Sequence, residues 1–271
     1  MSYLSRDNSG LPSELWKEID ATVKQAAAKS LTGRRFLHIY GPLGAGAQSI
    51  AVDSSGDTEE VFEDGLITTK GRRFVEIPAL YEDFTLSARD LENSRKYGTP
   101  VDLTRVKYAA EAGARREDRF LYFGNERLGY DGLLTAAGTQ KITRSDWTSG
   151  ENAFSDIASA AGLFAAKGIF GSYTLAISPD LYYQLQRIQP GTGVLEIDRI
   201  SKLLGGNILN APALGAGKAV LVCAEPENMD LVIGQDLAAA YLEQKDLNHS
   251  FRLLETVLLR VKRREAIAVF E

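Results

Sequence analysis

Residues 33–44 read Gly33-Arg34-Arg35-Phe36-Leu37-His38-Ile39-Tyr40-Gly41-Pro42-Leu43-Gly44. Apolar and polar side chains mix over Arg35–Tyr40 as in a half-buried strand, and the glycines and proline over Gly41–Gly46 predict a turn after it. Glycine-rich turns also follow strands in dinucleotide-binding folds, but these glycines lack the G-x-G-x-x-G spacing and no helix start follows them. The segment therefore predicts a strand that ends in a structural turn, without a cofactor.

An amphipathic helix precedes this strand. Pro12-Ser13-Glu14 is a helix-start pattern, and apolar side chains then recur at steps of three or four, namely Trp16, Ile19, Val23, Ala27 and Leu31. We expect Gly33 to end the helix. Burial of the large side chains in this stripe contributes about 1.5 to 3 kcal/mol each, so the helix must dock. Its own domain and a neighbouring subunit are both open as the docking partner.

An acidic, polar segment follows from Asp53 to Gly71. It has too few apolar residues for a core of its own, and its carboxylates include Asp57, Glu59, Glu60, Glu63 and Asp64. We expect a long projecting hairpin whose returning strand covers Phe74–Leu80. The cluster lacks the ligand spacing of a calcium loop, so a solvated hairpin tip is favoured over a metal site.

The remaining pattern mixes helices with strands. Residues Leu103–Phe123 carry an apolar face among many charges, which predicts a long amphipathic helix. Between about 135 and 224 we expect a separate α/β region, with helices at Ala153–Ala166 and Leu181–Arg187 and strands at Tyr173–Ile177, near Ile208 and at Ala219–Cys223. The C-terminal quarter returns to strands at Met229–Ile233, Phe251–Val261 and Ala266–Phe270. The fold class is therefore α+β.

Composition excludes several classes of protein. The 271 residues include 31 Lys and Arg against 36 Asp and Glu, a formal charge of -5, which removes the bulk electrostatic reason to expect nucleic-acid or membrane binding. The single Cys223 excludes an internal disulfide, and the two histidines, His38 and His249, stand far apart, which excludes a common zinc site. No apolar run approaches the roughly 18 residues of a membrane span, and the N-terminal residues are unlike a secretory signal. We therefore expect a cytoplasmic protein.

The usual catalytic signatures are missing. Neither a G-x-S-x-G elbow nor an H-E-x-x-H pair occurs. The run Gly215-Ala216-Gly217-Lys218 lacks the first glycine and the hydroxyl residue of a phosphate loop, so a hairpin turn is the better interpretation. His38 and His249 have no positioned partner, and Cys223 is most simply a small buried hydrophobe. The sequence predicts a structural or assembly protein rather than an enzyme, with no cofactor and no metal.

Several segments together resemble the encapsulins, which are bacterial and archaeal shell proteins. They lie in collinear order over essentially the whole chain: WKEID at 16–20, GRRFLHIYGPLG at 33–44, DFTL at 83–86, DLEN at 90–93, GIFGSYTL at 168–175 and IGQDL at 233–237. The resemblance implies the fold of tailed-phage major capsid proteins, the Hong Kong ninety-seven type. It implies an N-terminal helical arm and first peripheral strand at 1–46, an extended loop at 47–80, a peripheral domain with a spine helix at 81–134, an axial domain at 135–224 and C-terminal peripheral strands at 225–271.

The resemblance also implies a function. Encapsulin subunits self-assemble into icosahedral shells of roughly sixty subunits or a multiple of that number. The shells enclose cargo enzymes, of the ferritin-like or dye-decolorizing peroxidase type, that carry a C-terminal targeting peptide. The subunit itself is no enzyme, and neither nucleic acid nor a membrane is expected as a partner. Some members bind flavin on a tryptophan after the Phe-Thr-Leu segment, but Arg89 stands there in this chain, so flavin is not predicted.

Two sites follow from the resemblance. The targeting peptide is expected in an interior groove with apolar pockets and two polar contacts, formed by Arg34, Phe36, His38, Ile39, Ile233 and Leu237. Simple core packing is the alternative role for the apolar members of this set. The five-fold pore is expected at an uncharged loop, Gln189, Pro190, Gly191, Thr192 and Gly193, for which an ordinary helix-to-helix turn is the alternative.

Two other classes of function stay open at this point. A phage or prophage major capsid protein that encloses DNA shares the implied fold, although the sequence shows no long coiled-coil scaffolding segment of the kind that such proteins often carry. Particles free of nucleic acid would separate the two. A secreted protease or bacteriocin-like protein, as relatives have been labelled, is disfavoured by the missing signal and the missing nucleophile constellation.

Overall fold

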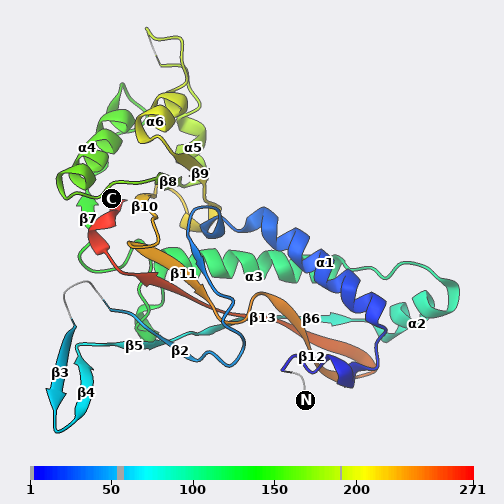
Figure 1. Ribbon diagram of the computed structural model, residues 1–271. Helices are drawn as coiled ribbons and strands as arrows, with labels where there is room; N and C mark the ends of the chain where they lie inside the picture. Colours follow the sequence, from blue (N-terminus) through cyan, green and yellow to red (C-terminus); the bar gives the residue numbers. More distant parts are fainter. Residues whose placement is uncertain (1–2, 54–57, 190) are drawn as a thin grey trace.

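A long strand, β13 (Asn248–Val261), organises the first of two five-stranded sheets (Figure 1). The computed structural model describes residues 3–53, 58–189 and 191–271. The first half of β13 pairs with β12 (Ala238–Lys245) on one side and with β6 (Ala79–Leu86) on the other, both antiparallel. Its second half pairs with β11 (Met229–Ile233), which in turn pairs in parallel with the short β1 (Ile39–Tyr40).

Two long helices, α1 (Ser13–Ser30) and α3 (Thr104–Phe123), run side by side along this sheet (Figure 1). The apolar stripe of α1 is buried there, and the indole of Trp16 meets the ring of Phe251 edge-on at 5.5 Å between centroids. Val106 and Ala110 of α3 belong to the same buried cluster. Both predicted helices are confirmed, and the stripe of α1 docks on its own chain.

The segment after α1 differs from the prediction. The helix ends at Ser30, Gly33–Arg35 forms a short 3-10 helix, and only Ile39–Tyr40 is a strand. The reason is Asp118 of α3, whose buried carboxylate accepts hydrogen bonds from the backbone N–H groups of Thr32 and Gly33 at 2.8 and 3.0 Å. These contacts hold the chain in a turn where the sequence pattern favours a strand.

The second sheet has the order β7-β14-β10-β8-β9 and carries the helices of the upper part of Figure 1. Its strands are β7 (Gln140–Ile142), β8 (Tyr173–Ile177), β9 (Asn207–Asn210), β10 (Ala219–Cys223) and β14 (Ile267–Phe270). The helices beside it are α4 (Asn152–Ala166), α5 (Pro179–Gln184) and α6 (Glu196–Leu204). The helices and strands predicted between 135 and 224 are confirmed within a few residues.

The last strand, β14, is a correction to the expected grouping. The sequence places it with the C-terminal strands of 225–271, but it lies between β10 and β7 in the second sheet, with Val220 opposite Val269. All four of its residues are buried, as befits a strand covered on both faces. A short apolar run of this kind has no alternation that would say which sheet receives it.

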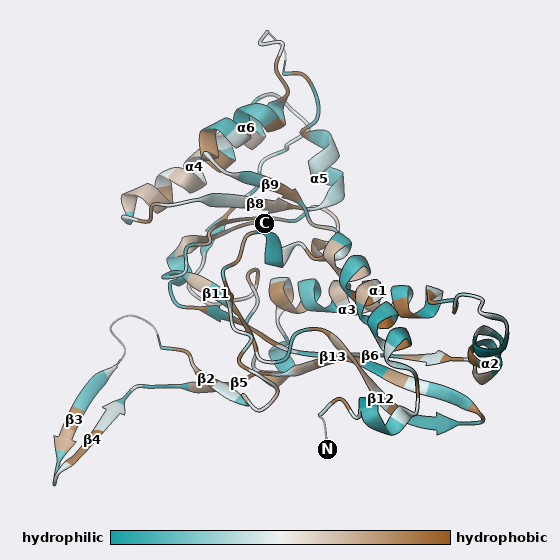
Figure 2. Ribbon diagram, turned by 45° about the vertical axis from the view of Figure 1, so that its right-hand side comes forward, coloured by the Kyte–Doolittle hydropathy of each residue, from teal (hydrophilic) through white to brown (hydrophobic). Residues whose placement is uncertain are grey.

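The predicted projecting hairpin is confirmed outside residues 54–57, which include Asp57 and lie outside the described residues. Strands β2 (Ser49–Ala51) and β5 (Phe74–Glu76) pair near the body, and β3 (Glu59–Glu63) pairs with β4 (Leu66–Lys70) at the far end. The two turn residues at the tip, Asp64 and Gly65, have φ values of 49° and 79°, as a tight hairpin turn requires. The hairpin stands clear of the body and carries exposed hydrophobic as well as hydrophilic residues (Figure 2).

Helix α2 (Ala88–Tyr97) lies at the opposite end of the first sheet (Figure 1). Ser87 caps it by accepting a hydrogen bond from the N–H of Asp90, and none of its residues is buried. Without a buried face the helix has no apolar stripe to predict it. Short 3-10 helices cover Arg6–Ser9, Glu126–Leu128, Pro212–Leu214 and Arg264–Ala266.

The largest buried cluster is shared by the two sheets. It runs from Leu121 and Tyr122 near the end of α3 through Trp147 and Phe164 to Phe270, and it includes Leu231 and Leu259 of the first sheet. This shared core fixes the two sheets relative to each other. No helix among the described residues is both long enough and apolar enough to cross a bilayer.

Candidate functional site

A groove of about 600 Å³ lies between α1 and the segment that connects β11 to β12. One side comes from the second half of α1, and the other from residues 235–238. Its lining consists of Arg6, Asp20, Val23, Lys24, Ala27, Ala28, Leu31, Arg34, Arg35, Gln235, Asp236, Leu237 and Ala238. The groove thus combines an aliphatic floor with charged side chains along its edges.

The aliphatic floor forms because the stripe of α1 continues past the sheet. Ala27 and Leu31 are buried against Ala114 of α3, and Leu237 packs on them from the other side. Ala28 stays exposed within the lining, on the same helix. Small side chains on the helix leave room beside Leu237, and that room is the groove.

Arg34 closes one end of the groove. Its guanidinium donates to Glu117 of α3, with 2.7 Å between Nη2 and Oε2, and to Glu255 of β13, with 2.9 Å between Nη2 and Oε2. A third pair reaches Asp236, with 2.7 Å between Nη1 and Oδ1. Glu117 and Glu255 are each 1% exposed, so Arg34 binds two carboxylates in the protein interior.

Burial shifts the pKa values of the ionisable groups in this cluster. Burial raises the pKa of Glu255 well above its usual range, and the negative charge of neighbouring Glu117 raises it further. Burial alone would lower the pKa of Arg34, but its hydrogen bond and ion pair with Glu117 outweigh burial and raise it. Burial also raises the pKa of Asp118, although the hydrogen bonds from Gly33 and Thr32 oppose this effect. Arg34 therefore stays charged beside the groove at every pH the protein meets.

The structure brings together only part of the residue set expected for peptide binding. Arg34 and Leu237 line the groove. Ile233 is 2% exposed, lies in the main core and is not part of the groove lining. Phe36 and Ile39 pack half-buried against the same core, and the exposed His38 is not part of the groove lining.

Sequence reasoning missed several members of the groove and its frame. Asp20, Lys24 and Ala28 lie on the polar side of α1, outside its apolar stripe. No local sequence pattern distinguishes them from other solvent-facing helix residues. Glu117 and Glu255 do carry a signal, because each is a carboxylate at a position where its element is otherwise apolar. A charge on an apolar face predicts a buried partner.

The expected pore loop connects α5 to α6 and projects beyond both helices (Figure 1). Gly191, Thr192 and Gly193 are exposed, as a pore-lining position requires. Gln189 is 3% exposed and faces inward, which contradicts a pore-lining role for its side chain within the subunit. Pro190, the remaining member, lies outside the described residues.

Ion pairs and hydrogen bonds fasten the base of this loop. Gln189 donates from Nε2 to Oε1 of Glu151 at 2.6 Å and accepts from Arg199. Arg187 pairs with the fully buried Glu196, with 2.8 Å between Nε and Oε2. The uncharged tip of the loop is therefore anchored by ion pairs and hydrogen bonds of charged side chains, which the sequence did not predict.

The described residues contain no group of three or more His, Cys, Asp and Glu side chains placed to hold a metal ion. Arg89 is exposed on α2, beside Asp90 and Tyr97 at a shallow surface hollow. Cys223 is buried, and burial raises the pKa of its thiol. None of these positions is a stronger candidate for a functional site than the groove or the pore loop.

Comparison with known proteins indicates the family of the chain, which the geometry of the groove and the loop does not. A family model, Linocin_M18, described as encapsulating protein for peroxidase, matches residues 1–258. The type 1 encapsulin shell protein EncA of Myxococcus xanthus is 40% identical, over 99% of this chain and 96% of the relative. A diheme-cytochrome-encapsulin shell fusion protein of Kuenenia stuttgartiensis is 36% identical, over 95% of this chain and 73% of the relative.

Solved structures agree on the fold. The virus-like particle of Pyrococcus furiosus superimposes with a TM-score of 0.77 at 23% identity, over 95% of this chain and 100% of that one. The capsid of the Myoviridae phage XM1 gives a TM-score of 0.65 at 17% identity, over 89% and 91% of the two chains. The fold is therefore that of tailed-phage major capsid proteins, the Hong Kong ninety-seven type. The sequence relatives are shell proteins, structural rather than catalytic, and this chain belongs to the encapsulin shell protein family.

Proposed function

We propose that this chain assembles with copies of itself into a closed icosahedral shell in the cytoplasm and encloses cargo proteins that carry a C-terminal targeting peptide. The groove between α1 and residues 235–238 carries the proposal, because it is a preformed site of the size and chemistry of an extended peptide. With a single cysteine the fold depends on no internal disulfide, which agrees with a reducing compartment.

The groove lining supports a peptide with aliphatic anchors. Ala27, Leu31 and Leu237 offer an apolar floor, and Asp20, Lys24 and Arg35 are placed along the edges to orient polar groups. Apolar contacts supply affinity and a few polar contacts fix direction in such sites. This refines the residue set expected from sequence: Arg34 and Leu237 remain, and Phe36, His38, Ile39 and Ile233 give way to residues of α1.

The names of the relatives support an enzyme or electron carrier as cargo. The family model is described as encapsulating a peroxidase, and the shell protein of Kuenenia stuttgartiensis is fused to a diheme cytochrome. We propose that this shell receives a redox protein of the ferritin-like or dye-decolorizing peroxidase type. Mass spectrometry of proteins that co-purify with native particles identifies the cargo, and particles that contain no second protein would contradict cargo enclosure.

Two alanines of α1 allow a matched test of the groove. Ala28 is exposed and lines the groove, whereas Ala21 is exposed on the same helix and does not line it. Ala28→Phe should fill the groove without disturbing the core and lower the cargo per shell severalfold, with particles still forming. Ala21→Phe should load cargo like the unmodified shell. Equal loading by both variants would remove the peptide from this groove.

The observation that favours a cargo shell over a DNA-filled capsid is sequence identity, since both classes share the fold. Relatives named encapsulin shell proteins reach 40% identity, whereas the phage XM1 capsid reaches 17%. The excess of acidic over basic residues agrees with this choice. Light scattering of purified protein should reveal megadalton particles, and their absorbance at 260 and 280 nm should be that of protein alone. Particles rich in nucleic acid would favour the capsid function.

A further inference from the structure

The groove between α1 and residues 235–238 is short. Along α1 its lining extends from Asp20 to Leu31, a distance of about 16 Å at the rise of an α-helix. An extended peptide rises about 3.3 Å per residue, so about five residues fill this length. The groove therefore holds a short stretch of a partner chain.

An arginine crosses the groove at each end. At one end Arg34, in the turn after α1, pairs with Asp236 in the opposite wall, with 2.7 Å between Nη1 and Oδ1. At the other end Arg6 donates to both carboxylate oxygens of Asp20 at 2.7 Å, and from Nε to the carbonyl oxygen of Ala239 in β12 at 2.9 Å. The middle of a partner chain would have to turn out of the groove at both bridges, whereas a chain end turns out only once. The shape favours a chain end.

The charges that line the groove do not balance. Both carboxylates of the lining already belong to the two arginine bridges. Two further cations line the groove, Lys24 and Arg35, and both are exposed and outside every ion pair among the described residues. The guanidinium of Arg35 makes one long hydrogen bond, of 3.3 Å, to the carbonyl oxygen of Lys29, so it retains donors for a ligand. The groove thus offers two uncompensated cations to its occupant.

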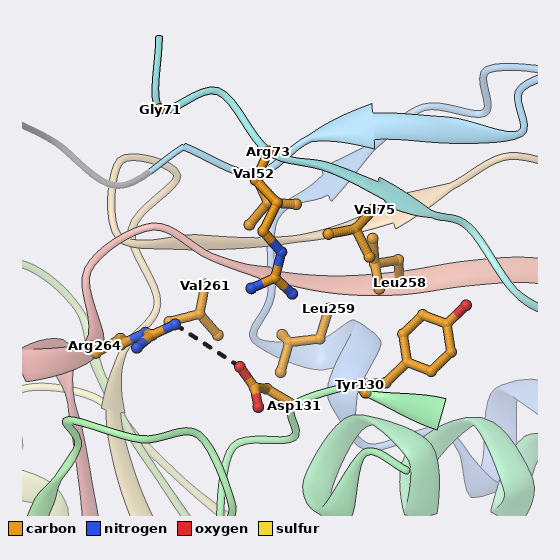
Figure 3. Close-up of a pocket in the computed structure, with 11 residues that line it drawn as sticks. Val52, Gly71, Arg73, Val75, Tyr130, Asp131, Leu258, Leu259, Val261 and Arg264 are labelled. Atoms are coloured by element: carbon orange, nitrogen blue, oxygen red, sulfur yellow. Dashed lines mark ion pairs between the residues drawn. The ribbon is translucent and has the colours of Figure 1, made fainter. Parts of the chain in front are cut away.

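A second hollow lined by arginines lies at the base of the extended loop (Figure 3). Arg73 and Arg264 line it together with Asp131, and its volume is about 170 Å³, against about 600 Å³ for the groove. Pockets that bind ligands typically measure about 300–1,000 Å³. The groove falls within this range and the hollow below it, so the groove is the cationic site that suits a peptide.

We propose that Lys24 and Arg35 bind the free α-carboxylate at the C-terminus of the cargo's targeting peptide. The inference rests on the proposed function and adds the chemical group by which the groove recognises its partner. Guanidinium and ammonium groups bind carboxylates through charge-assisted hydrogen bonds. Every peptide that ends a chain carries such a carboxylate, whatever its sequence. The aliphatic floor then receives the side chains that directly precede the terminus.

A pair of peptides that differ only at the terminus tests the contact. The probe is a fluorescent synthetic peptide of about ten residues, twice the length that fills the groove, with the C-terminal sequence of the cargo that mass spectrometry identifies. Shells are dissociated and reassembled with it, and the fluorescence that they retain measures binding. The free acid should bind about fivefold or more tightly than the same peptide with a C-terminal amide, because the amide keeps the length and loses the charge. Equal binding of the two would overturn the inference, even if an acidic side chain of the peptide contributes to affinity.

Substitutions in the groove test the two residues. Lys24→Met and Arg35→Met should each weaken binding of the free acid and leave binding of the amide unchanged, so the double variant should bind acid and amide equally. Lys17 is exposed on α1 and does not line the groove, and Lys17→Met should therefore keep the full preference for the acid. Thermal unfolding of each variant verifies that the subunit folds. A double variant that still prefers the acid would overturn the assignment to these residues.

Ala28→Phe, which fills the groove, separates this inference from the proposed function. If it prevents binding of acid and amide while the unmodified shell binds both equally, the groove holds the peptide and only the carboxylate contact is wrong. If Ala28→Phe changes neither, the peptide lies elsewhere and the proposed function loses its site.

Discussion

Arg34 and Glu117 form an ion pair, with 2.7 Å between Nη2 and Oε2, that joins the turn after α1 to the middle of the fold. Glu117 is 1% exposed, and the same nitrogen of Arg34 lies 2.9 Å from the equally buried Glu255. One cation therefore connects the turn after α1 to α3 and β13 at the end of the groove.

Removal of the cation should destabilise the subunit strongly. Arg34→Met leaves Glu117 and Glu255 buried without a positive partner, which typically costs about 3–5 kcal/mol. Arg252→Met is the matched control, because Arg252 pairs with the half-exposed Asp83 and such a surface pair contributes about 0–1 kcal/mol. Thermal unfolding of both variants at neutral pH measures the difference. A small, equal loss of stability in the two would show that the buried cluster is not a structural element.

Replacement of Glu255 by Gln should make stability less dependent on pH. Because burial raises the pKa of Glu255 in the folded protein, the folded state holds this proton more tightly than the unfolded chain, in which a glutamate titrates near about 4.3. Unfolding therefore releases a proton, and stability falls as pH rises above the unfolded value toward the folded one, by up to about 1.4 kcal/mol per pH unit. Glu255→Gln removes this loss and keeps a hydrogen-bond acceptor for Arg34.

The measurement is the difference in melting temperature between Glu255→Gln and the unmodified protein from about pH 5 to about pH 8. This difference should grow in favour of the variant as pH rises. The raised pKa of Asp118 acts in the same direction but is present in both proteins, so it cancels. A difference that stays constant across the range would mean that Glu255 is not the titrating group.

A negative charge on the pore loop should slow the passage of anions. Thr192 is exposed at the tip, and its hydroxyl accepts from the N–H of Val194, a contact that an aspartate carboxylate can keep. The backbone hydrogen bonds of Gln189 with Thr192 and Val194 also remain, and only the bond from the Thr192 hydroxyl to the carbonyl of Gln189 is lost. Thr192→Asp should therefore preserve the loop and place a ring of negative charge at the five-fold axis, which reduces anion influx and leaves cation influx equal or higher. Gln186→Asp, exposed on the same segment but outside the loop, is the control. Influx of an anionic chelator into intact shells gives the rates, and equal rates for both variants would argue against this loop as the pore.

Two glycines near the second sheet should respond in opposite directions to alanine. Gly206 directly precedes β9, and an added Cβ there would overlap the carbonyl oxygen of Tyr173 in β8. Gly206→Ala should cost about 1–3 kcal/mol through this overlap. Gly162 is exposed in α4 with open space around it, so Gly162→Ala should stabilise the helix by about 0.5–1 kcal/mol. The melting temperatures of the two variants check both signs.

The sequence predicts the elements whose burial follows a simple period. The stripe of α1 and the apolar face of α3 mark two helices correctly, and the acidic run between Asp53 and Gly71 marks the hairpin correctly. The pattern does not predict α2, which buries nothing. Nor does it predict the 3-10 turn at Gly33, which depends on a carboxylate that comes from α3, far along the chain.

The candidate sites could be predicted from the sequence less completely than the fold. The family resemblance led to Arg34 and Leu237, and it implied a wall from the N-terminal helix without naming residues there, because Lys24 and Ala28 look like ordinary solvent-facing helix residues. Ile233 is an apolar residue of the kind expected in a peptide pocket, but its side chain is buried in the core. Gln189 lies in the expected pore segment, but its side chain is buried within the subunit. Direction and depth of a side chain depend on tertiary contacts that neither period nor spacing encodes.

The position of β14 bears on the timing of folding during synthesis. The second sheet lacks the strand that joins β7 to β10 until residues 267–270 of β14 have left the ribosome. A nascent chain can already pair β13 with β6 and β12 at that stage, but its upper sheet remains open along two strand edges. The second sheet, and the surface that it carries, can therefore form only after β14 has been synthesised.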